Sequence, residues 1–215
     1  MPFDVVEGDP DIRYGWYLRP SYEMSRAQAE MHDLLRRQFG LVCGGVFMPH
    51  ATIKGFYRSD APVAEMIAVY DRAVAGHHPF PIYNAGPVRF SPRSIVLDVN
   101  ALPDGSPNEP LQSIHRDIWH AITPLVHPEC DFTWTDSVLD RFHAHLTLVM
   151  ADLDPRFQDE VFEFVEAAMP IGPSSFMAEY FHFFAFHSED WSGKWWLTLE
   201  WQLLQSWKLA GETGA

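Results

Sequence analysis

The pattern His-x-Thr occurs twice in this chain, each time inside an apolar run that is typical of a β-strand. His50 and Thr52 belong to the run VFMPHATIKGF, and His145 and Thr147 lie ninety-five residues further on in RFHAHLTLVM. Because side chains alternate across a strand, residues two apart point to the same face, so each motif places an imidazole beside a hydroxyl. One copy would be weak evidence in a chain with eleven histidines, but two copies in two predicted strands indicate a single site with two of each group.

The periodicity of apolar residues predicts the same order of elements around both motifs. The polar stretch NALPDGSPNE at 100–109 is the expected joint between the copies, because of its Pro, Gly and Asn content. The pattern therefore predicts an internal duplication of α-β-α-β-β units within one bilobal domain, with a first copy at about 12–100 and a second at about 110–206. The expected helices are 22–39, 62–74, 110–126 and 155–168, and the expected strands besides the motif strands are 12–18, 80–90, 94–99, 176–186 and 194–205.

Composition is that of a globular protein, with 47% hydrophobic and 14% aromatic residues. No apolar run approaches the roughly eighteen residues of a membrane span, and the first residues lack the basic end and apolar stretch of a signal peptide. The two cysteines, Cys43 and Cys130, show no CxxC spacing, which argues against a disulfide framework and against a zinc site. These features predict a cytoplasmic protein with no membrane contact, and we expect a monomer.

The formal net charge of −14 limits the possible partners. An excess of negative charge removes the long-range attraction that binding an extended polyanion normally uses. A small phosphate ester held by a few local hydrogen-bond donors remains compatible with that charge. The sequence therefore argues against an extended nucleic-acid partner and favours a small phosphate-containing ligand.

The duplicated His-x-Thr in strands, the spacing between the copies and the order of the elements resemble the 2H phosphoesterase superfamily, which includes the 2′,5′ RNA ligase-like proteins and cyclic nucleotide phosphodiesterases. The likeness runs from YGWYLRP through MPHATIKGF and FHAHLTLVM to KWWLTLEWQLL. It implies an α+β fold of two pseudo-symmetric lobes, each a small, mostly antiparallel sheet backed by helices. A cleft between the lobes would hold all four motif residues. In the family a proline commonly precedes the motif histidine, as Pro49 does, whereas the second copy has Ala144.

The two motifs carry the groups that cleavage of a phosphodiester needs. One histidine takes a proton from the attacking oxygen while the other protonates the leaving oxygen, and the near-neutral pKa of imidazole suits both tasks. The hydroxyls of Thr52 and Thr147 can donate hydrogen bonds to the phosphoryl oxygens as their charge grows. We therefore expect His50, Thr52, His145 and Thr147 to be catalytic, with neither a metal nor another cofactor. The near-symmetry of the motifs leaves the choice of acid and base open.

Further substrate-binding candidates follow from alternation along the motif strands. Lys54 and Phe56 share the expected face of His50, and Arg141 and His143 share that of His145. A lysine can hold a phosphate as a point charge and an aromatic ring can stack on a base. Trp16, on the first strand, is a candidate stacking residue in the family resemblance. For Lys54 and Phe56, a position at the strand end that covers the lobe surface is an equal alternative, and for Trp16 a position in the core is at least an equal one.

The function expected from these residues is metal-independent hydrolysis of a small nucleotide-derived ester: a 2′,3′- or 1″,2″-cyclic phosphate or a 2′,5′-linked oligonucleotide. RNA end-joining at the same site and a module that binds nucleotides or RNA ends without turnover are the alternatives. His143-Ala144-His145 also allows a metal reading, but the Glu of a cupin motif is missing, since Val149 and Met150 stand in its place. A metal hydrolase is therefore the more distant alternative.

Overall fold

The computed structural model describes residues 3–130 and 141–211 and has an α+β architecture, as expected. Seven strands form one antiparallel sheet in the order β4-β5-β6-β2-β1-β8-β9, and β3 and β7 form a second, two-stranded sheet. The strands of the large sheet are β1 (Ile12–Arg19), β2 (Ala51–Tyr57), β4 (Gly86–Ser91), β5 (Ser94–Asp98), β6 (His145–Val149), β8 (Tyr180–His187) and β9 (Glu200–Lys208). Those of the small sheet are β3 (Phe80–Tyr83) and β7 (Ser175–Ala178).

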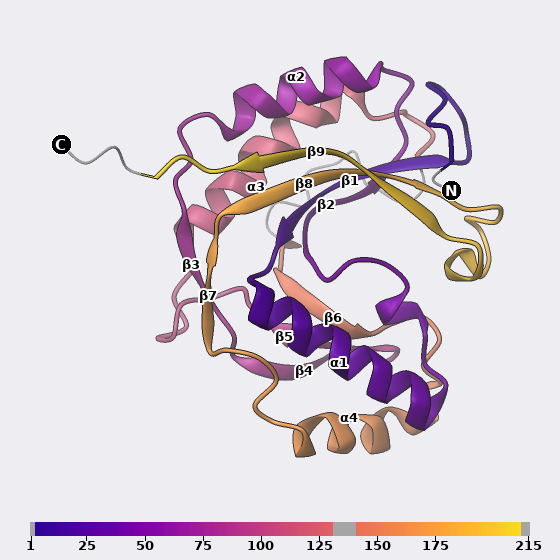
Figure 1. The fold of residues 1–215 in the computed structure, drawn as a ribbon, viewed down its shortest axis with the longest axis vertical. Coiled ribbons are helices and arrows are strands. Elements are labelled where there is room, and N and C mark those ends of the chain that lie inside the picture. Colours follow the sequence, from indigo (N-terminus) through magenta and orange to yellow (C-terminus); the bar gives the residue numbers. More distant parts are fainter. Residues whose placement is uncertain (1–2, 131–140, 212–215) are drawn as a thin grey trace.

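The α-helices lie on two sides of the large sheet (Figure 1). In that view α2 lies above β1, β2, β8 and β9 with α3 behind it, whereas α1 and α4 accompany the β4, β5 and β6 part below. α1 begins where the Ser21 side chain accepts the Met24 N–H at 3.3 Å, and it ends at Gly40 with a left-handed φ of 71°. No described helix is long and apolar enough to cross a membrane. The helices are α1 (Tyr22–Phe39), α2 (Val63–Val74), α3 (Glu109–Ile122) and α4 (Gln158–Ala167).

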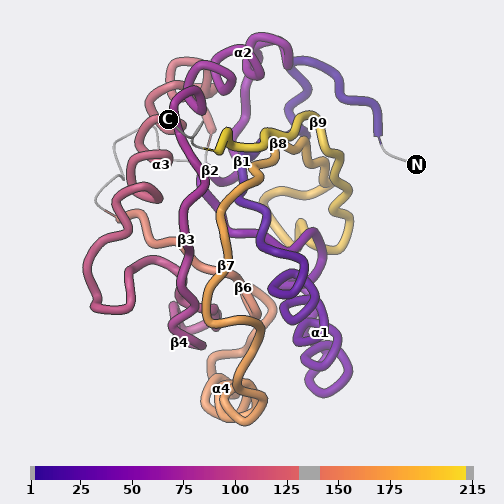
Figure 2. The backbone as a smooth tube through the Cα atoms, turned by 60° about the vertical axis from the view of Figure 1, so that its left-hand side comes forward, coloured from indigo at the N-terminus to yellow at the C-terminus, as the bar shows by residue number. Residues whose placement is uncertain are grey.

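Both halves of the chain contribute strands to each part of the large sheet. β1 and β2 lie beside β8 and β9, whereas β4 and β5 lie beside β6. The order β-α-β-α-β-β runs from β1 to β4 and recurs from β5 to β8, with β9 added at the end. This recurrence begins at β5, before the predicted joint at 100–109. The small sheet also joins the halves, because β3 and β7 pair along their length, side by side in Figure 2.

The two motif strands meet at the centre of the large sheet. β2 and β6 pair antiparallel through Ala51 and Leu146, the middle residues of the two motifs, and both are fully buried in the main core. Neighbouring residues on a strand point to the opposite face, so all four motif side chains share the other face, called the motif face below. In an antiparallel register the same pairing sets His50 opposite Thr147 and Thr52 opposite His145. The structure thus brings the two motifs together.

A bulge interrupts β2 directly after the first motif. Tyr17 of β1 pairs with Thr52, but Trp16 pairs with Lys54, so Ile53 is an extra residue. The Ile53 carbonyl accepts a hydrogen bond from Nδ1 of His115 on α3 at 2.8 Å. The extra residue breaks the alternation of side chains, and Lys54 therefore does not share the face of Thr52.

Two apolar clusters cover the two faces of the β1 and β8 region. The main core lies between the sheet and the helices and includes Trp16. The second cluster lies on the motif face and consists mostly of aromatic rings beside the first motif. Its buried members are Tyr17, Cys43, Phe47, Phe184, Phe186 and Trp195.

Candidate active site

His50 is held by its own backbone and by two aromatic rings. Its Nδ1 bonds the Met48 carbonyl at 2.8 Å, so Nδ1 carries the proton and Nε2 keeps the lone pair of the neutral ring. The imidazole stacks on Phe47 at 4.7 Å between centroids and meets Tyr17 edge-on at 4.8 Å. Burial, together with the smaller effects of the nearby His145 and His32, lowers the pKa of His50 to about 4. His50 is therefore neutral at neutral pH.

His145 repeats the backbone contact in a different environment. Its Nδ1 bonds the carbonyl of His143 at 2.7 Å, again two residues earlier, and again leaves Nε2 free for chemistry. The Phe90 ring lies 4.5 Å away between centroids. Burial lowers the pKa of His145 and His143 lowers it further, but the carboxylate of Asp98 acts in the opposite direction. Asp98 is paired with His145 across β5 and β6, and it also accepts His143 Nε2 at 3.0 Å.

The threonines complete the pairs, and α1 supports one of them. Thr52 is half-buried and Thr147 is buried. The Thr147 carbonyl is bonded by Gln28 Nε2 and His32 Nε2, both at 2.9 Å. The bonded carbonyl is next to Leu146, the residue of β6 that pairs with β2. The two α1 side chains therefore hold the backbone of the second motif in place. The sequence analysis did not predict a role for Gln28 and His32. The signal that could have identified them is a polar pair four residues apart beside the apolar stripe of a helix.

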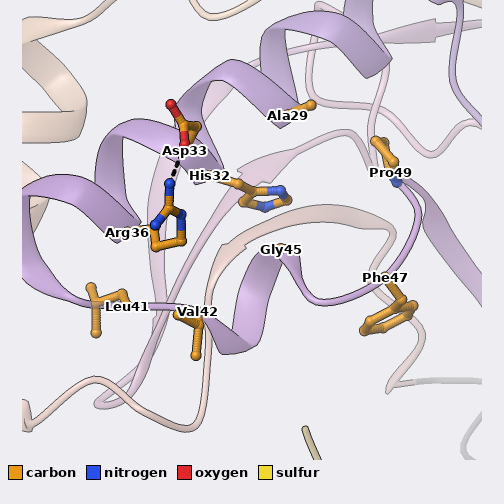
Figure 3. A pocket seen from close by; sticks show the side chains of 9 residues that line it. All are labelled: Ala29, His32, Asp33, Arg36, Leu41, Val42, Gly45, Phe47 and Pro49. Carbon is orange, nitrogen blue, oxygen red and sulfur yellow. Dashed lines mark hydrogen bonds and ion pairs between the residues drawn. The ribbon is translucent and has the colours of Figure 1, made fainter. Parts of the chain in front are cut away.

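A pocket of about 230 Å³ borders the first motif. It lies between α1 and the segment after it, with Phe47 and Pro49 on the side of His50 (Figure 3). His32 faces this space, while Asp33 and Arg36 form an ion pair of 2.8 Å at its edge. The sequence analysis did not predict this pocket, because its walls come from segments without a motif.

The remaining predicted substrate-binding residues lie in three different surroundings. Phe56 lies on the motif face, with its ring 4.8 Å from Phe186, and His143 reaches Asp98 beside the second motif. Arg141 is exposed. Lys54 and Trp16, in contrast, are 2% and 0% exposed and lie on the core side of the sheet.

The core positions of these two residues have local causes. The bulge turns Lys54 toward α3, where its Nζ lies 3.9 Å from the centre of the Trp119 ring. Trp16 pairs with Lys54 and stacks on Phe181 at 4.6 Å. The structure therefore does not bring either of them to the motif histidines. Within residues 3–130 and 141–211, no three His, Cys, Asp or Glu side chains are grouped in a way that would hold a metal ion.

Comparison with known proteins identifies the family of the chain and structures with a similar fold. The model of the 2′-5′ RNA ligase superfamily matches residues 17–188, and the chain belongs to this family of 2H phosphoesterases. The structure of TT0787 of Thermus thermophilus is similar, with a TM-score of 0.62 and 16% identity over 93% of this chain and 99% of that chain. E. coli LigT complexed with 3′-AMP gives a TM-score of 0.51 and 15% identity over 93% and 98%. No curated protein matches the chain.

Proposed function

We propose that this protein is a phosphodiesterase that hydrolyses a small nucleotide-derived ester by general acid-base catalysis with two histidines. The pairing of Ala51 with Leu146 carries the proposal, because it sets each motif histidine beside the threonine of the other motif. Each imidazole has its Nδ1 occupied by a backbone carbonyl, so the two Nε2 atoms are the groups that exchange protons with substrate. This arrangement fits one phosphoryl group between two proton carriers and two hydroxyls.

The proposed reaction transfers two protons while one bond forms and one breaks. A water oxygen attacks phosphorus, and the Nε2 of one histidine takes the proton of that water. The bond from phosphorus to the leaving hydroxyl oxygen breaks, and the Nε2–H of the other histidine protonates that oxygen. Thr52 and Thr147 donate hydrogen bonds to the non-bridging oxygens, which gain charge on the way to the transition state. The products are a phosphomonoester and a free hydroxyl.

The neighbours of the two histidines favour one division of roles. His50 is surrounded by aromatic rings, and the charged groups that act on its pKa are other histidines, which lower it. His145 faces the carboxylate of Asp98, which favours its protonated form. We therefore assign the base to His50 and the acid to His145 in the hydrolytic direction. Once bound, an anionic phosphate adds to the stabilisation of protonated His145.

The proposed substrates are a 2′,3′-cyclic phosphate, a 1″,2″-cyclic phosphate or a 2′,5′-linked oligonucleotide. LigT, which shares the fold, is complexed with 3′-AMP in one of its structures, which supports a ligand of nucleotide size. The net charge of −14 disfavours a long polyanion. RNA end-joining would use the same groups in reverse, but it needs a second RNA end on this acidic surface.

A panel of substrates tests the proposal. Cyclic phosphates and 2′,5′- and 3′,5′-linked dinucleotides are incubated with the protein in a chelator, and the products are identified by the hydroxyl that carries the phosphate. We expect turnover of at least one ester, unaffected by the chelator. A His50→Ala, His145→Ala double variant serves as the control for contaminating phosphodiesterase. Tight nucleotide binding with no cleavage of any member would instead favour the binding module, and activity restored by zinc would favour a metal hydrolase.

A further inference from the structure

A row of cationic and aromatic side chains extends from the first motif across the sheet. β1 and β8 pair Arg19 with Tyr180, and β8 and β9 pair Tyr180 with Lys208. Directly opposed residues of antiparallel strands share a face. Arg19 is two residues after Tyr17, so the row lies on the motif face. Leu18 pairs with Ala51, and continuing that register sets Arg19 opposite His50.

The two cations bracket one ring. The Arg19 guanidinium carbon lies 3.9 Å from the centre of the Tyr180 ring, and Lys208 Nζ lies 5.5 Å from it. Such stacking orients a guanidinium while leaving its N–H groups at the edge free to donate. Arg19 is exposed, and no ion pair joins it to a described carboxylate. Several other arginines of this acidic chain pair with a carboxylate, for example Arg26 with Glu30 at 2.6 Å.

His182 adds a further donor beside this pair. It is opposite Tyr17 on β8 and two residues from Tyr180, so it also lies on the motif face, in the row next to that of Arg19 and Tyr180. Burial, together with the smaller effect of the Arg19 charge, lowers the pKa of His182 to about 4, so His182 is neutral at neutral pH. Arg19, Lys208 and the neighbouring His182 therefore offer two cationic side chains and a neutral imidazole to a ligand. Neighbouring strands are about 4.8 Å apart, so Arg19 lies one strand from His50.

We propose that Arg19, stacked on Tyr180 and assisted by Lys208, binds a second phosphate of the substrate, next to the phosphoryl group that reacts at the two motifs. The substrate class would then be a nucleotide-derived phosphodiester that carries a further phosphate, either a terminal monoester or an internucleotide diester. This inference rests on the proposed function for the position of the reacting group. Binding of a bisphosphorylated nucleotide does not depend on turnover.

A binding experiment tests the second subsite without catalysis. Calorimetric titrations compare adenosine 3′,5′-bisphosphate with adenosine 3′-monophosphate on the wild type, on Arg19→Gln and on the matched control Arg26→Gln. We expect the bisphosphate to bind about tenfold or more tightly to the wild type and to the control, with most of that advantage lost in Arg19→Gln. Equal affinities of the two nucleotides for the wild type, or an advantage that survives in Arg19→Gln, would overturn the proposal.

Turnover identifies the source of the second phosphate. Values of kcat/KM are compared for a nucleoside 2′,3′-cyclic phosphate with a free 5′-hydroxyl, the same compound with a 5′-phosphate, and a dinucleotide ending in the cyclic phosphate. A preference for the 5′-phosphate that falls in Arg19→Gln supports a terminal monoester, and one for the dinucleotide alone supports a diester. No preference for either contradicts the proposal. If no compound is cleaved, the proposed function fails while the titration still decides on the subsite.

A second variant, Lys208→Gln, tests the same subsite at a position where a folding defect is not expected. Lys208 is exposed and ends the edge strand β9, so Lys208→Gln is expected to fold normally. It should reduce the bisphosphate advantage by about two- to fivefold, and added salt should reduce it in the wild type. Thermal unfolding of each variant confirms that the fold is intact. A Lys208→Gln protein with an unchanged advantage and a wild type without salt dependence would show that this row does not bind the phosphate.

Discussion

The two His-x-Thr motifs share their backbone geometry and differ in their surroundings. In both, the histidine Nδ1 bonds the carbonyl two residues earlier. His50, however, lies against the rings of Phe47 and Tyr17, whereas His145 faces the carboxylate of Asp98. A nearly symmetric scaffold thus carries an asymmetric distribution of charge. The pairing of β2 with β6 brings the two histidines together, while the residues around them, Phe47 and Tyr17 for His50 and Asp98 for His145, give each a different environment.

Removing either histidine should have the largest effect. His50→Ala or His145→Ala is expected to lower kcat by about 10² to 10⁴, the usual contribution of a positioned general acid or base, with little change in substrate affinity. Because the two act as a unit, the double variant should be scarcely worse than the poorer single one. Steady-state kinetics on the best substrate of the panel measures this. Normal turnover in both single variants would show that the motif histidines do not take part in catalysis.

The threonines should contribute less, and partly to binding. Thr52→Ala or Thr147→Ala is expected to cost about 10- to 1000-fold in kcat/KM, with part of the loss in KM, because their hydrogen bonds form in the ground state as well. The Thr→Ser variants keep the hydroxyl and should recover most of the activity. If serine fails as completely as alanine at both positions, the methyl group and not the hydroxyl is what the site requires.

The pH dependence should reveal the asymmetry directly. Activity should fall toward pH 4 as His50, with its pKa of about 4, becomes protonated and loses its role as base. It should fall at higher pH as His145 loses its proton, and burial lowers the pKa of His145 below 6.5, so kcat/KM should peak on the acid side of neutrality. Bound phosphate raises the pKa of His145, so the alkaline limb of kcat should lie at higher pH than that of kcat/KM.

Asp98→Asn tests which of the two histidines is the acid. Loss of the carboxylate removes an effect that raises the pKa of His145, so the alkaline limb should move to lower pH while the acidic limb stays in place. Asp117→Asn is the matched control, because Asp117 also bonds a histidine, His77 at 2.9 Å, and lies on α3. A shift of the acidic limb instead would assign the base to His145 and reverse the proposed roles.

His115 tests the bulge that separates the first motif from Lys54. His115→Ala removes the bond to the Ile53 carbonyl and the stack on Phe142 at 3.7 Å, and should lower the free energy of unfolding by about 2–3 kcal/mol. The exposed His120 on the same helix is the control, with an expected change within about 0.5 kcal/mol. Chemical denaturation measures both.

His115→Ala should also change how the free energy of unfolding depends on pH. The pKa of His115 is lowered to about 4 by burial, so the unfolded chain binds a proton that the folded protein rejects between about pH 6.5 and 4. Stability therefore rises with pH across that window, and His115→Ala should show a shallower rise. An unchanged slope would mean that the buried imidazole does not contribute to the pH dependence.

Lys54→Met should have the smallest effect. Its ammonium lies on Trp119 at the core side of the sheet, so we expect KM to change by less than about twofold and the free energy of unfolding by less than about 1 kcal/mol. A tenfold rise in KM would place Lys54 in contact with the substrate, as alternation along an unbroken strand had predicted.

Local patterns predicted the α+β class, the helices and the strand positions of both motifs, because alternation and helical periodicity are properties of the chain itself. The pairing of Ala51 with Leu146 depends on contacts between residues ninety-five positions apart, and the bulge at Ile53 depends on His115, so neither has a local signal. Lys54 was predicted as a substrate-binding residue from alternation along its strand and Trp16 from the family resemblance, and the bulge and the aromatic core account for their burial. Gln28 and His32 were missed because their partner, the Thr147 carbonyl, is a backbone group.

The exchange of strands between the two halves of the chain has a consequence for how the protein can be divided. A fragment that ends after β4 lacks β8, which pairs with its own β1, and β9 beyond it, and a fragment that begins at β5 lacks β4. Each would leave a sheet edge unpaired and a motif without its partner. Cut in the turn between β4 and β5, the two fragments should remain unfolded alone and recover structure and activity together only when mixed, with rates that depend on their concentrations.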